Sequence, residues 1–399
     1  MAKNITSVSW KASNLPSGLS FDTATGTFSG TPSGEGEYTV PVSVKTNYGE
    51  DSKDVIIKTV KAYPVYAIGG MAATWSENAE PDANGFRKLN MPNAYWLQSL
   101  YKGFSAQTSL SGDWYLGSSL SDGNAYGVPN ESFLIPRKYP VEGIAEMIGA
   151  YDTSSEDSFF CYAKKNDRGT YHYKNGALER TSITVMLSKD FTSSDYARIY
   201  KNTDGVLRLG GYGFLSSILE CDKEDIKKIG GTSGQGVSTG NFLVLKKNGE
   251  LLIFDISKTD GYSLNFALAP FQNEEGKITG VKNFWFGDWW STFFILLENN
   301  KLYARGANGN SQIGLSSEIN TSPAYVYEVG TFNVKKICQP FLLTEDGEFY
   351  HTGDFKKTNR FYVDGIPSHT EFTRIFPEYV FDDIAFPYGA NTLLVTSKE

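Results

Sequence analysis

The sequence predicts an all-β protein that begins with a small sandwich and continues as a longer ring of repeated sheets. Strand-like runs recur about every 50 residues through most of the chain, which is typical of a repeat array. The 40 glycines and an aromatic content of 14% suit many short strands that are joined by tight turns. The residues before the first repeat follow a different pattern, so we expect two domains, at 1–62 and 63–399.

The repeat is built around one short run that combines aromatic or aliphatic residues with glycine. Its seven copies start at Val65, Trp114, Tyr171, Val206, Leu251, Leu302 and Phe349. Hairpins lead into the later copies, as in FLVLKKNGELLIFD, FFILLENNKLYARG and FLLTEDGEFYHTGD, where Asn, Asp and Gly supply the positive φ that tight turns require. A further strand lies upstream of each hairpin, and these strands begin at Ile226, Val281, Val334 and Asp382.

A unit of about 50 residues that holds three or four antiparallel strands is typical of a propeller blade. The copies therefore predict a seven-bladed β-propeller. The last unit ends at NTLLVTSKE, which offers one hairpin strand without its partner, and the first unit opens with PVYAIGG, which offers that partner. We expect these N- and C-terminal strands to pair, so that the ring closes and leaves no open sheet edge.

The blade that contains Leu302 resembles the repeat of the regulator of chromosome condensation family. That repeat carries a strand, then G-x-N, then Q-x-G-L, then a Pro and a Val. The matching residues here are Gly306, Asn308, Gln312, Gly314, Leu315, Pro323 and Val326. A corner that precedes the hairpin in the family survives as Gly287, with Trp290 in the place of a His. The resemblance covers residues 64–399 as a pattern and implies a seven-bladed propeller, but it implies little about activity.

The N-terminal part carries a second set of motifs. Trp10 is followed by LPSGLSFD, then by TGTFSGTP, then by GEY, and the alternation in Tyr38, Val40, Val42 and Val44 predicts a half-buried strand. We expect a turn at Asp22, Thr25 and Gly26, between Phe21 and Phe28. The motif resembles the immunoglobulin-like, cadherin-like sandwich found in bacterial surface proteins and phage structural proteins, and it extends over residues 5–61.

Composition and charge exclude several functional classes from our expectations. The net charge is −8, which disfavours a nucleic-acid partner, and no apolar run approaches the roughly 20 residues of a membrane span. The N-terminus shows no apolar secretory signal segment. The spacing of cysteine and histidine indicates no disulfide framework and no metal site, because these residues are scattered: Cys161, Cys221, Cys338, His172, His351 and His369. We find no catalytic or cofactor motif and expect a protein that is not an enzyme.

The most distinctive side chains lie in NFWFGDWW, from Asn283 to Trp290. Aromatic rings beside an acid can stack on sugars or form a protein-binding hot spot, so Phe286, Asp288 and Trp289 are the candidate binding residues. The alternative is packing between blades, which also needs bulky residues. Trp290, at the family's corner position, is expected to point inward, and Trp289 is expected on the opposite side of the strand, towards the surface.

Three functions compete at this point. The first is a bacteriophage virion protein, a capsid or tail appendage, whose sandwich docks on other virion proteins and whose propeller binds a host-surface glycan or protein. The second is a bacterial adhesin at the cell surface or secreted. The third is a carbohydrate-active propeller enzyme. We favour the first, mainly on the resemblance of the two domains, and the sequence leaves homo-oligomerisation open.

Overall fold

The computed structural model describes most of the chain. The residues outside the description are 1–4, 101–102, 111, 120–131, 141–143, 145–148, 152–158, 165–169, 175–176, 181–183, 187–197, 202–206, 211–216, 219–224, 234–239, 256–271, 274–275, 288–291, 307, 318–325, 356–360, 388 and 399. The chain divides into two compact units, Met1–Ala62 and Tyr63–Glu399.

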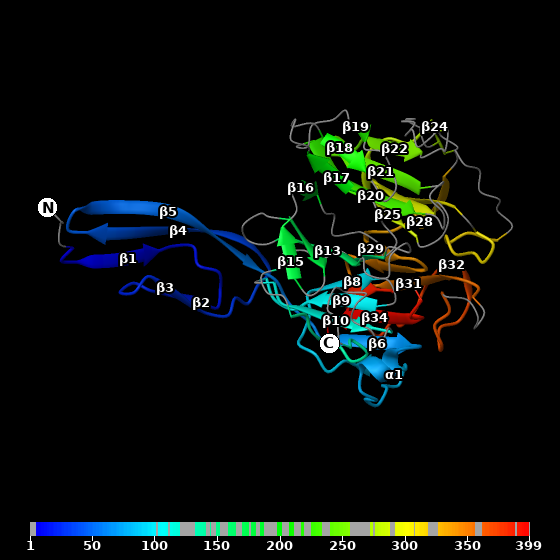
Figure 1. Ribbon diagram of the computed structural model, residues 1–399, viewed down its shortest axis with the longest axis horizontal. Coiled ribbons are helices and arrows are strands. Elements are labelled where there is room, and N and C mark those ends of the chain that lie inside the picture. Colours follow the sequence, from blue (N-terminus) through cyan, green and yellow to red (C-terminus); the bar gives the residue numbers. More distant parts are fainter. Residues whose placement is uncertain are drawn as a thin grey trace. The chain divides into compact units, whose positions relative to one another are not determined.

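The first unit is a small arrangement of strands (Figure 1). One sheet has the order β1 (Val8–Ala12), β4 (Gly36–Thr46) and β5 (Gly49–Thr59), and all its pairs are antiparallel. A hairpin of β2 (Leu19–Asp22) and β3 (Thr27–Gly30) forms the second layer. Val40 of β4 is fully buried, whereas Tyr38, Val42 and Val44 are half-buried, so the half-buried alternation predicted for this strand is confirmed.

The turn of the β2–β3 hairpin follows the prediction as well. The Asp22 side-chain Oδ1 accepts hydrogen bonds from the backbone N–H groups of Ala24 (2.8 Å) and Thr25 (3.3 Å). Gly26 has φ +70, and a Cβ at this position would lie 2.8 Å from the indole of Trp10. The position therefore requires glycine both for its backbone conformation and for the close approach of the ring.

The second unit is a succession of small antiparallel sheets. The first runs in the order β8 (Trp96–Leu100), β9 (Gly103–Gln107), β10 (Trp114–Ser118) and β11 (Arg137–Lys138). The second comprises β12 (Gly149–Tyr151), β13 (Phe159–Lys164), β14 (Thr170–Lys174) and β15 (Ala177–Arg180). The third comprises β16 (Thr184–Met186), β17 (Arg198–Lys201), β18 (Leu207–Gly210) and β19 (Ser217–Ile218).

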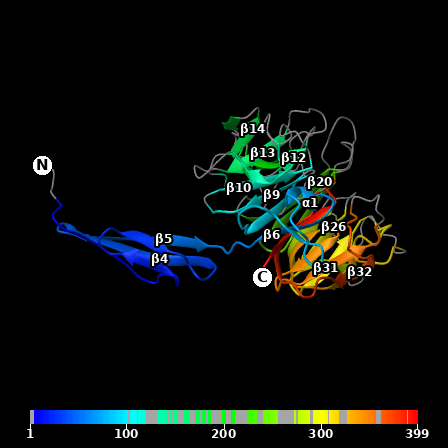
Figure 2. The ribbon, with the colours of Figure 1, turned by 90° about the horizontal axis from the view of Figure 1, so that it is seen from below.

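The following sheets repeat the same order. One comprises β20 (Ile226–Ser233), β21 (Gly240–Lys246) and β22 (Leu251–Asp255), and a short ladder of β23 (Gln272–Asn273) and β24 (Gly276–Lys277) follows it. The next comprises β25 (Val281–Phe286), β26 (Phe293–Leu297), β27 (Lys301–Arg305) and β28 (Tyr327–Thr331). The next comprises β29 (Val334–Cys338), β30 (Phe341–Thr344), β31 (Phe349–Gly353) and β32 (His369–Arg374). In Figure 2 the colours of these sheets run around the unit from cyan through green to orange.

The last sheet joins the two ends of the array. Its order is β33 (Phe381–Ala385), β34 (Thr392–Ser397), β6 (Val65–Gly69) and β7 (Arg87–Lys88). The C-terminal strand β34 pairs with β6, and in Figure 1 the red strand lies beside the blue one. The predicted closure by N- and C-terminal strands is confirmed. A single helix of four residues, α1 (Ala72–Trp75), follows β6 in the described part of the chain.

Each of the seven repeated runs recognised in the sequence is the third strand of its sheet, namely β6, β10, β14, β18, β22, β27 and β31. The run has this place because it is the returning arm of the central hairpin. The fold class is thus the predicted one, nearly all-β, while the number of blades stays a prediction. Among the described residues no helix has the length and apolar character needed to cross a membrane.

Candidate functional site

The first strands of successive sheets contact one another. β20 packs against β25, β25 against β29, β29 against β33, and β33 against β8. In a propeller these first strands lie nearest the central axis, so they bring side chains of different blades together. We call β20, β25, β29, β33 and β8 the inner strands.

Four of the inner strands share one irregularity. The register with the second strand shifts at Lys227 in β20, at Lys282 in β25, at Lys335 in β29 and at Asp382 in β33. A β-bulge of this kind inserts one unpaired residue and re-aims the side chains next to it. The residue after each bulge then reaches the neighbouring blade, and this residue is Lys228, Asn283, Lys336 or Asp383.

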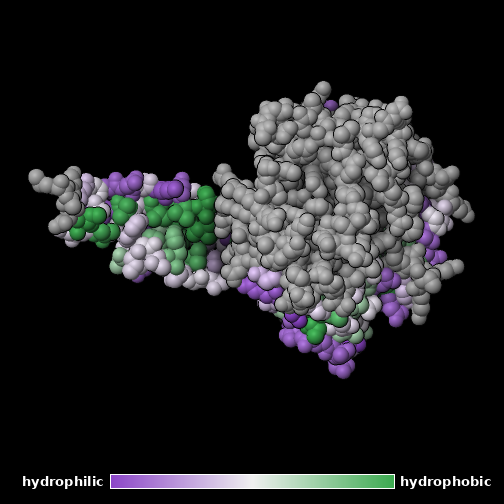
Figure 3. Space-filling view, in the orientation of Figure 1, coloured by the Kyte–Doolittle hydropathy of each residue, from purple (hydrophilic) through white to green (hydrophobic). Residues whose placement is uncertain are grey.

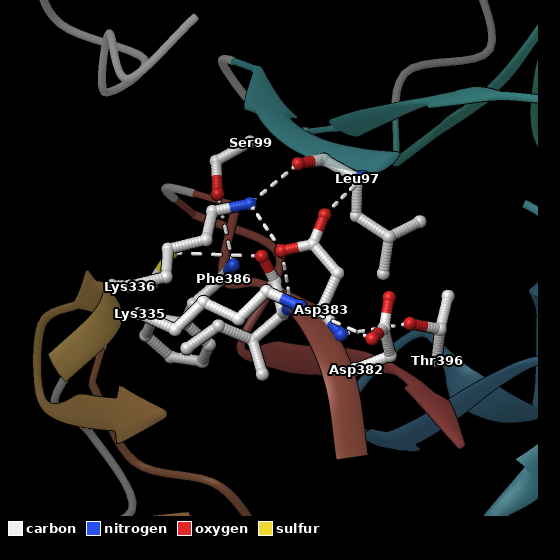
Figure 4. Close-up of polar contacts among 10 residues, drawn as sticks. Leu97, Ser99, Lys335, Lys336, Asp382, Asp383, Phe386 and Thr396 are labelled. Atoms are coloured by element: carbon white, nitrogen blue, oxygen red, sulfur yellow. Dashed lines mark hydrogen bonds and ion pairs between the residues drawn. The ribbon is translucent and has the colours of Figure 1, made fainter. Parts of the chain in front are cut away.

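The contact between β29 and β33 is a buried ion pair (Figure 4). The ammonium of Lys336 donates to Asp383 Oδ1 at 2.7 Å and to the backbone carbonyl of Leu97 in β8 at 2.6 Å. The other oxygen of Asp383 accepts from the N–H of Leu97 at 2.6 Å, and Oδ1 also accepts from the N–H of Ile384. One ion pair thus ties three inner strands together.

Burial and pairing act in opposite directions on Asp383. The side chain is buried, which raises the pKa of Asp383, and the Lys336 ammonium and the backbone N–H groups of Leu97 and Ile384 act to lower it. Because these partners occupy both carboxylate oxygens, the pair is suited to holding blades together and not to proton transfer. A similar contact with uncharged acceptors recurs between β20 and β25, where Lys228 donates to the Asn283 side chain at 3.0 Å and to the Phe284 carbonyl at 2.6 Å.

The bulge residues remain accessible. Lys227 is exposed, whereas Lys282, Lys335 and Asp382 are half-buried. Lys335 and Lys398 both lie within ion-pair distance of Asp382, at 3.1 and 3.4 Å. Equivalent positions on consecutive blades therefore present a row of charged side chains around the inner strands.

A second polar cluster lies on β31 and β32. The Nδ1 atoms of His351 and His369 are 3.1 Å apart, and His351 is 4% exposed. Burial, with a smaller contribution from His369, lowers the pKa of His351 to about 3, so the buried ring is neutral near pH 7. The described residues hold no group of three or more His, Cys, Asp or Glu that could bind a metal ion.

The residues of the repeat motif have structural roles in this fold. Asn308 donates through its side chain to the carbonyls of Leu315 and Ser316, and Gln339 of the next blade donates to the carbonyl of Gln312. Gly314 has φ +81, and a Cβ there would lie 2.6 Å from the ring of Phe372. The motif therefore folds the loop after β27 and seats it against the next sheet. Val326 is buried, and Pro323 lies outside the described residues.

The aromatic candidates divide into two groups. Phe286 is 3% exposed and packs against the rings of Phe284 and Phe293, so at this position the structure supports packing over a surface contact. Asp288 and Trp289, like Trp290, lie outside the described residues. The residues that flank them are joined, because the N–H of Gly287 donates to the carbonyl of Thr292 at 2.9 Å.

Sequence reasoning missed the polar contacts between blades. Their signal is a polar pair that follows the first apolar residue of the four bulged inner strands: IKK in β20, VKN in β25, VKK in β29 and FDD in β33. Without the register of the bulge, such a pair looks like a solvated face of a strand, and nothing in one blade shows which residue of the next blade it meets.

Comparisons with known proteins agree with this architecture. Residues 2–61 match the family model described as "Putative Ig domain". No curated protein matches the chain in sequence.

Three solved structures resemble the chain over most of its length. Prp20p from Saccharomyces cerevisiae matches with a TM-score of 0.55 at 11% identity, over 85% of this chain and 92% of that one. Yeast RCC1 (Prp20) in complex with Kap60 matches with a TM-score of 0.54 at 11% identity, over 85% and 89%. Human WBSCR16 matches with a TM-score of 0.54 at 10% identity, over 85% and 100%. At these identities the likeness shows the fold: an Ig-like domain precedes a propeller of the RCC1 type.

Proposed function

We propose that the chain is a non-enzymatic virion protein of a bacteriophage, a capsid or tail appendage that acts without a cofactor. Its Ig-like unit docks on other virion proteins, and its propeller binds a host-surface glycan or protein, or a further virion protein. The proposal places the protein on the virus particle and gives each unit one binding task.

The thin interior of the Ig-like unit carries the docking half of this proposal. Within its described residues Val40 is the fully buried large apolar side chain, and several others remain in solvent: Ile5, Val8, Tyr48, Ile56 and Val60. A unit of this size buries a small share of its surface, and such units commonly lean on a neighbour. Docking would cover these side chains and add to the stability of the unit.

The propeller suits rigid presentation of a binding face. Its inner strands are fastened by buried contacts such as Lys336 with Asp383, and its ring is closed by β34 and β6. Structures with the same fold concern binding between proteins: Prp20p with Gsp1p and histones, and yeast RCC1 with Kap60. We propose a partner of the same broad class, or a glycan, and we propose Asp288 and Trp289 as contact residues beside the buried strand β25.

The test is to find the protein on particles. Particles of a phage whose genome carries the gene would be purified by density gradient and analysed by mass spectrometry. They would also be labelled with a gold-conjugated antibody against the propeller and viewed by electron microscopy. We expect a fixed copy number per particle and labelling at one location. Recovery from the bacterial surface or the medium without particles would favour the adhesin, and turnover of a host glycan by the pure protein would contradict a non-enzymatic role.

A further inference from the structure

Strand β5 forms a long, regular edge of the Ig-like sheet. It pairs with β4 along its whole length, from Gly36↔Thr59 to Thr46↔Gly49, without a register shift. Among the described residues no strand pairs with its other side, because the sheet order is β1-β4-β5. The backbone N–H and C=O groups of alternate residues in this eleven-residue strand therefore face away from the sheet (Figure 1).

Natural proteins protect such edges with bulges, prolines, very short strands or charged side chains, because free backbone groups pair readily with another strand. β5 carries exposed charges, Lys53, Asp54 and Lys58 among them, and these are of both signs. β5 has no proline and no bulge, and it carries three consecutive apolar residues, Val55, Ile56 and Ile57. Ile56 is 49% exposed, and Val60, just beyond the strand, is 44% exposed. In Figure 3 hydrophilic side chains line the upper edge of this unit, where β5 runs, and apolar side chains gather directly below them. The edge has the properties of a pairing surface.

We propose that two copies of the chain associate by antiparallel pairing of their β5 edges, centred on Ile56. A two-fold axis perpendicular to the sheet relates the copies, so each residue faces its mirror position across Ile56, and side chains opposite each other lie on the same face. The two three-stranded sheets then continue into each other, and each dimer carries two propellers.

The sequence of β5 complements itself in this register. On the outer face the exposed Ile56 meets Ile56 of the second copy, and exposed Asp54 meets Lys58 twice, once on each side of the axis. On the inner face half-buried Val55 meets Ile57, also twice. Opposite charges and apolar pairs at directly facing positions stabilise a sheet, whereas like charges destabilise it.

Neighbouring registers with the same symmetry lack this match. A centre at Asp54 would place two carboxylates against each other, and a centre at Val55 would place Asp54 against Ile56. The charge pattern therefore selects the register centred on Ile56. Pairing through the Ig-like unit gives a bivalent molecule, and bivalency strengthens attachment to a surface that displays many ligands. Because this pairing covers Ile56 and Val60, docking on other virion proteins would then use the remaining exposed apolar side chains of the unit, Ile5, Val8 and Tyr48.

The first experiment measures the mass of the full chain by sedimentation velocity over a range of micromolar concentrations. We expect twice the mass of the 44.1 kDa chain. Asp54→Lys and Lys58→Asp, each alone, place like charges opposite each other and should weaken the dimer at least about tenfold. The double variant Asp54→Lys/Lys58→Asp restores opposite charges and should restore the dimer. Lys11→Asp, a charge reversal on the opposite edge strand β1, is the matched control and should leave the dimer unchanged.

The second experiment uses cysteine at the axis. Ile56→Cys brings two thiols face to face, so mild oxidation should link two chains. Ser52→Cys changes another outer-face residue of the same strand, and because it faces Val60 of the second copy it should not form the link. A chain that remains monomeric at all concentrations, a double variant that fails to restore dimers, or equal linking at both cysteines would overturn the proposal.

Discussion

Removal of one member of the Lys336–Asp383 pair should destabilise the propeller far more than removal of both. In Lys336→Met the carboxylate of Asp383 stays buried without its ammonium, and in Asp383→Leu the ammonium, with its side chain 14% exposed, keeps one carbonyl partner. Breaking a buried ion pair from one side costs about 3–5 kcal/mol, because the remaining charge is left without compensation.

The double variant Lys336→Met/Asp383→Leu removes both charges. Replacement of a buried pair by apolar residues of similar volume is often neutral. Here the N–H groups of Leu97 and Ile384 also lose their acceptor, which costs about 1–3 kcal/mol each. The sum of the single effects is then roughly 6–10 kcal/mol against about 2–6 kcal/mol for the double variant, so on central values the two positions should be coupled by about 4 kcal/mol.

The assay is calorimetric and urea-induced unfolding of the full chain and its three variants. With an unfolding entropy of about 2.1 cal/mol/K per residue, the propeller unit has roughly 0.7 kcal/mol/K, and a loss of 4 kcal/mol lowers its Tm by about 6 °C. Lys138→Met is the matched control, because Lys138 pairs with Asp113 at 2.8 Å on the surface, and it should cost less than about 1 kcal/mol. Additive losses at Lys336 and Asp383, or single losses as small as that of the control, would refute the reasoning.

Three further predictions concern the propeller. The pKa of His351 falls from 6.5 to about 3 on folding, so between these pH values the imidazole is protonated in the unfolded chain and neutral in the folded one. The free energy of unfolding should therefore drop by about 2 kcal/mol from pH 8 to pH 5. Urea titrations at each pH measure this decrease, and His351→Gln should lack it. Deletion of 392–399 removes the closing strand with the buried Leu393, Leu394 and Val395, about 1.5–3 kcal/mol each, so an unchanged Tm would contradict closure. Trp289→Ala should weaken binding to the partner with little effect on Tm, whereas Trp290→Ala should cost about 3–5 kcal/mol, and large equal Tm losses would exclude Trp289 as a contact residue.

The strand order of the propeller was predictable because each hairpin is specified locally. Its turn residues must adopt positive φ, and the structure places Asn300 at φ 64, Gly249 at φ 81 and Gly347 at φ 85 in the three hairpin turns recognised in the sequence. Ring closure was predictable for a related reason, since the two end fragments complete one hairpin when they are joined. The turn at Asp22 in the Ig-like unit follows the same logic of short-range hydrogen bonding.

The contacts between blades were not predictable from local patterns. Asp383 sits in FDD, which in isolation indicates a solvated strand face, and its partners Lys336 and Leu97 are far away in sequence. Their meeting depends on a bulge, and a bulge is a property of two paired strands and not of one. Burial of an ionised pair also depends on the neighbouring blade, which excludes water from a site that each strand alone would leave open.

Burial along β25 limits which of the aromatic candidates can contact a partner. The alternation rule assigns one face of a strand to the core and the other to solvent, but Phe284, Trp285 and Phe286 are all buried, because β25 is covered by neighbouring blades on both faces. Aromatic residues within an inner strand are therefore explained by packing. We therefore expect a contact residue after the end of β25 in the sequence. Among the candidates, Asp288 and Trp289 meet this condition, because β25 ends at Phe286. They follow Gly287, whose hydrogen bond to Thr292 joins the two sides of the hairpin. The binding hypothesis thus depends on these two positions and not on the aromatic content of the segment.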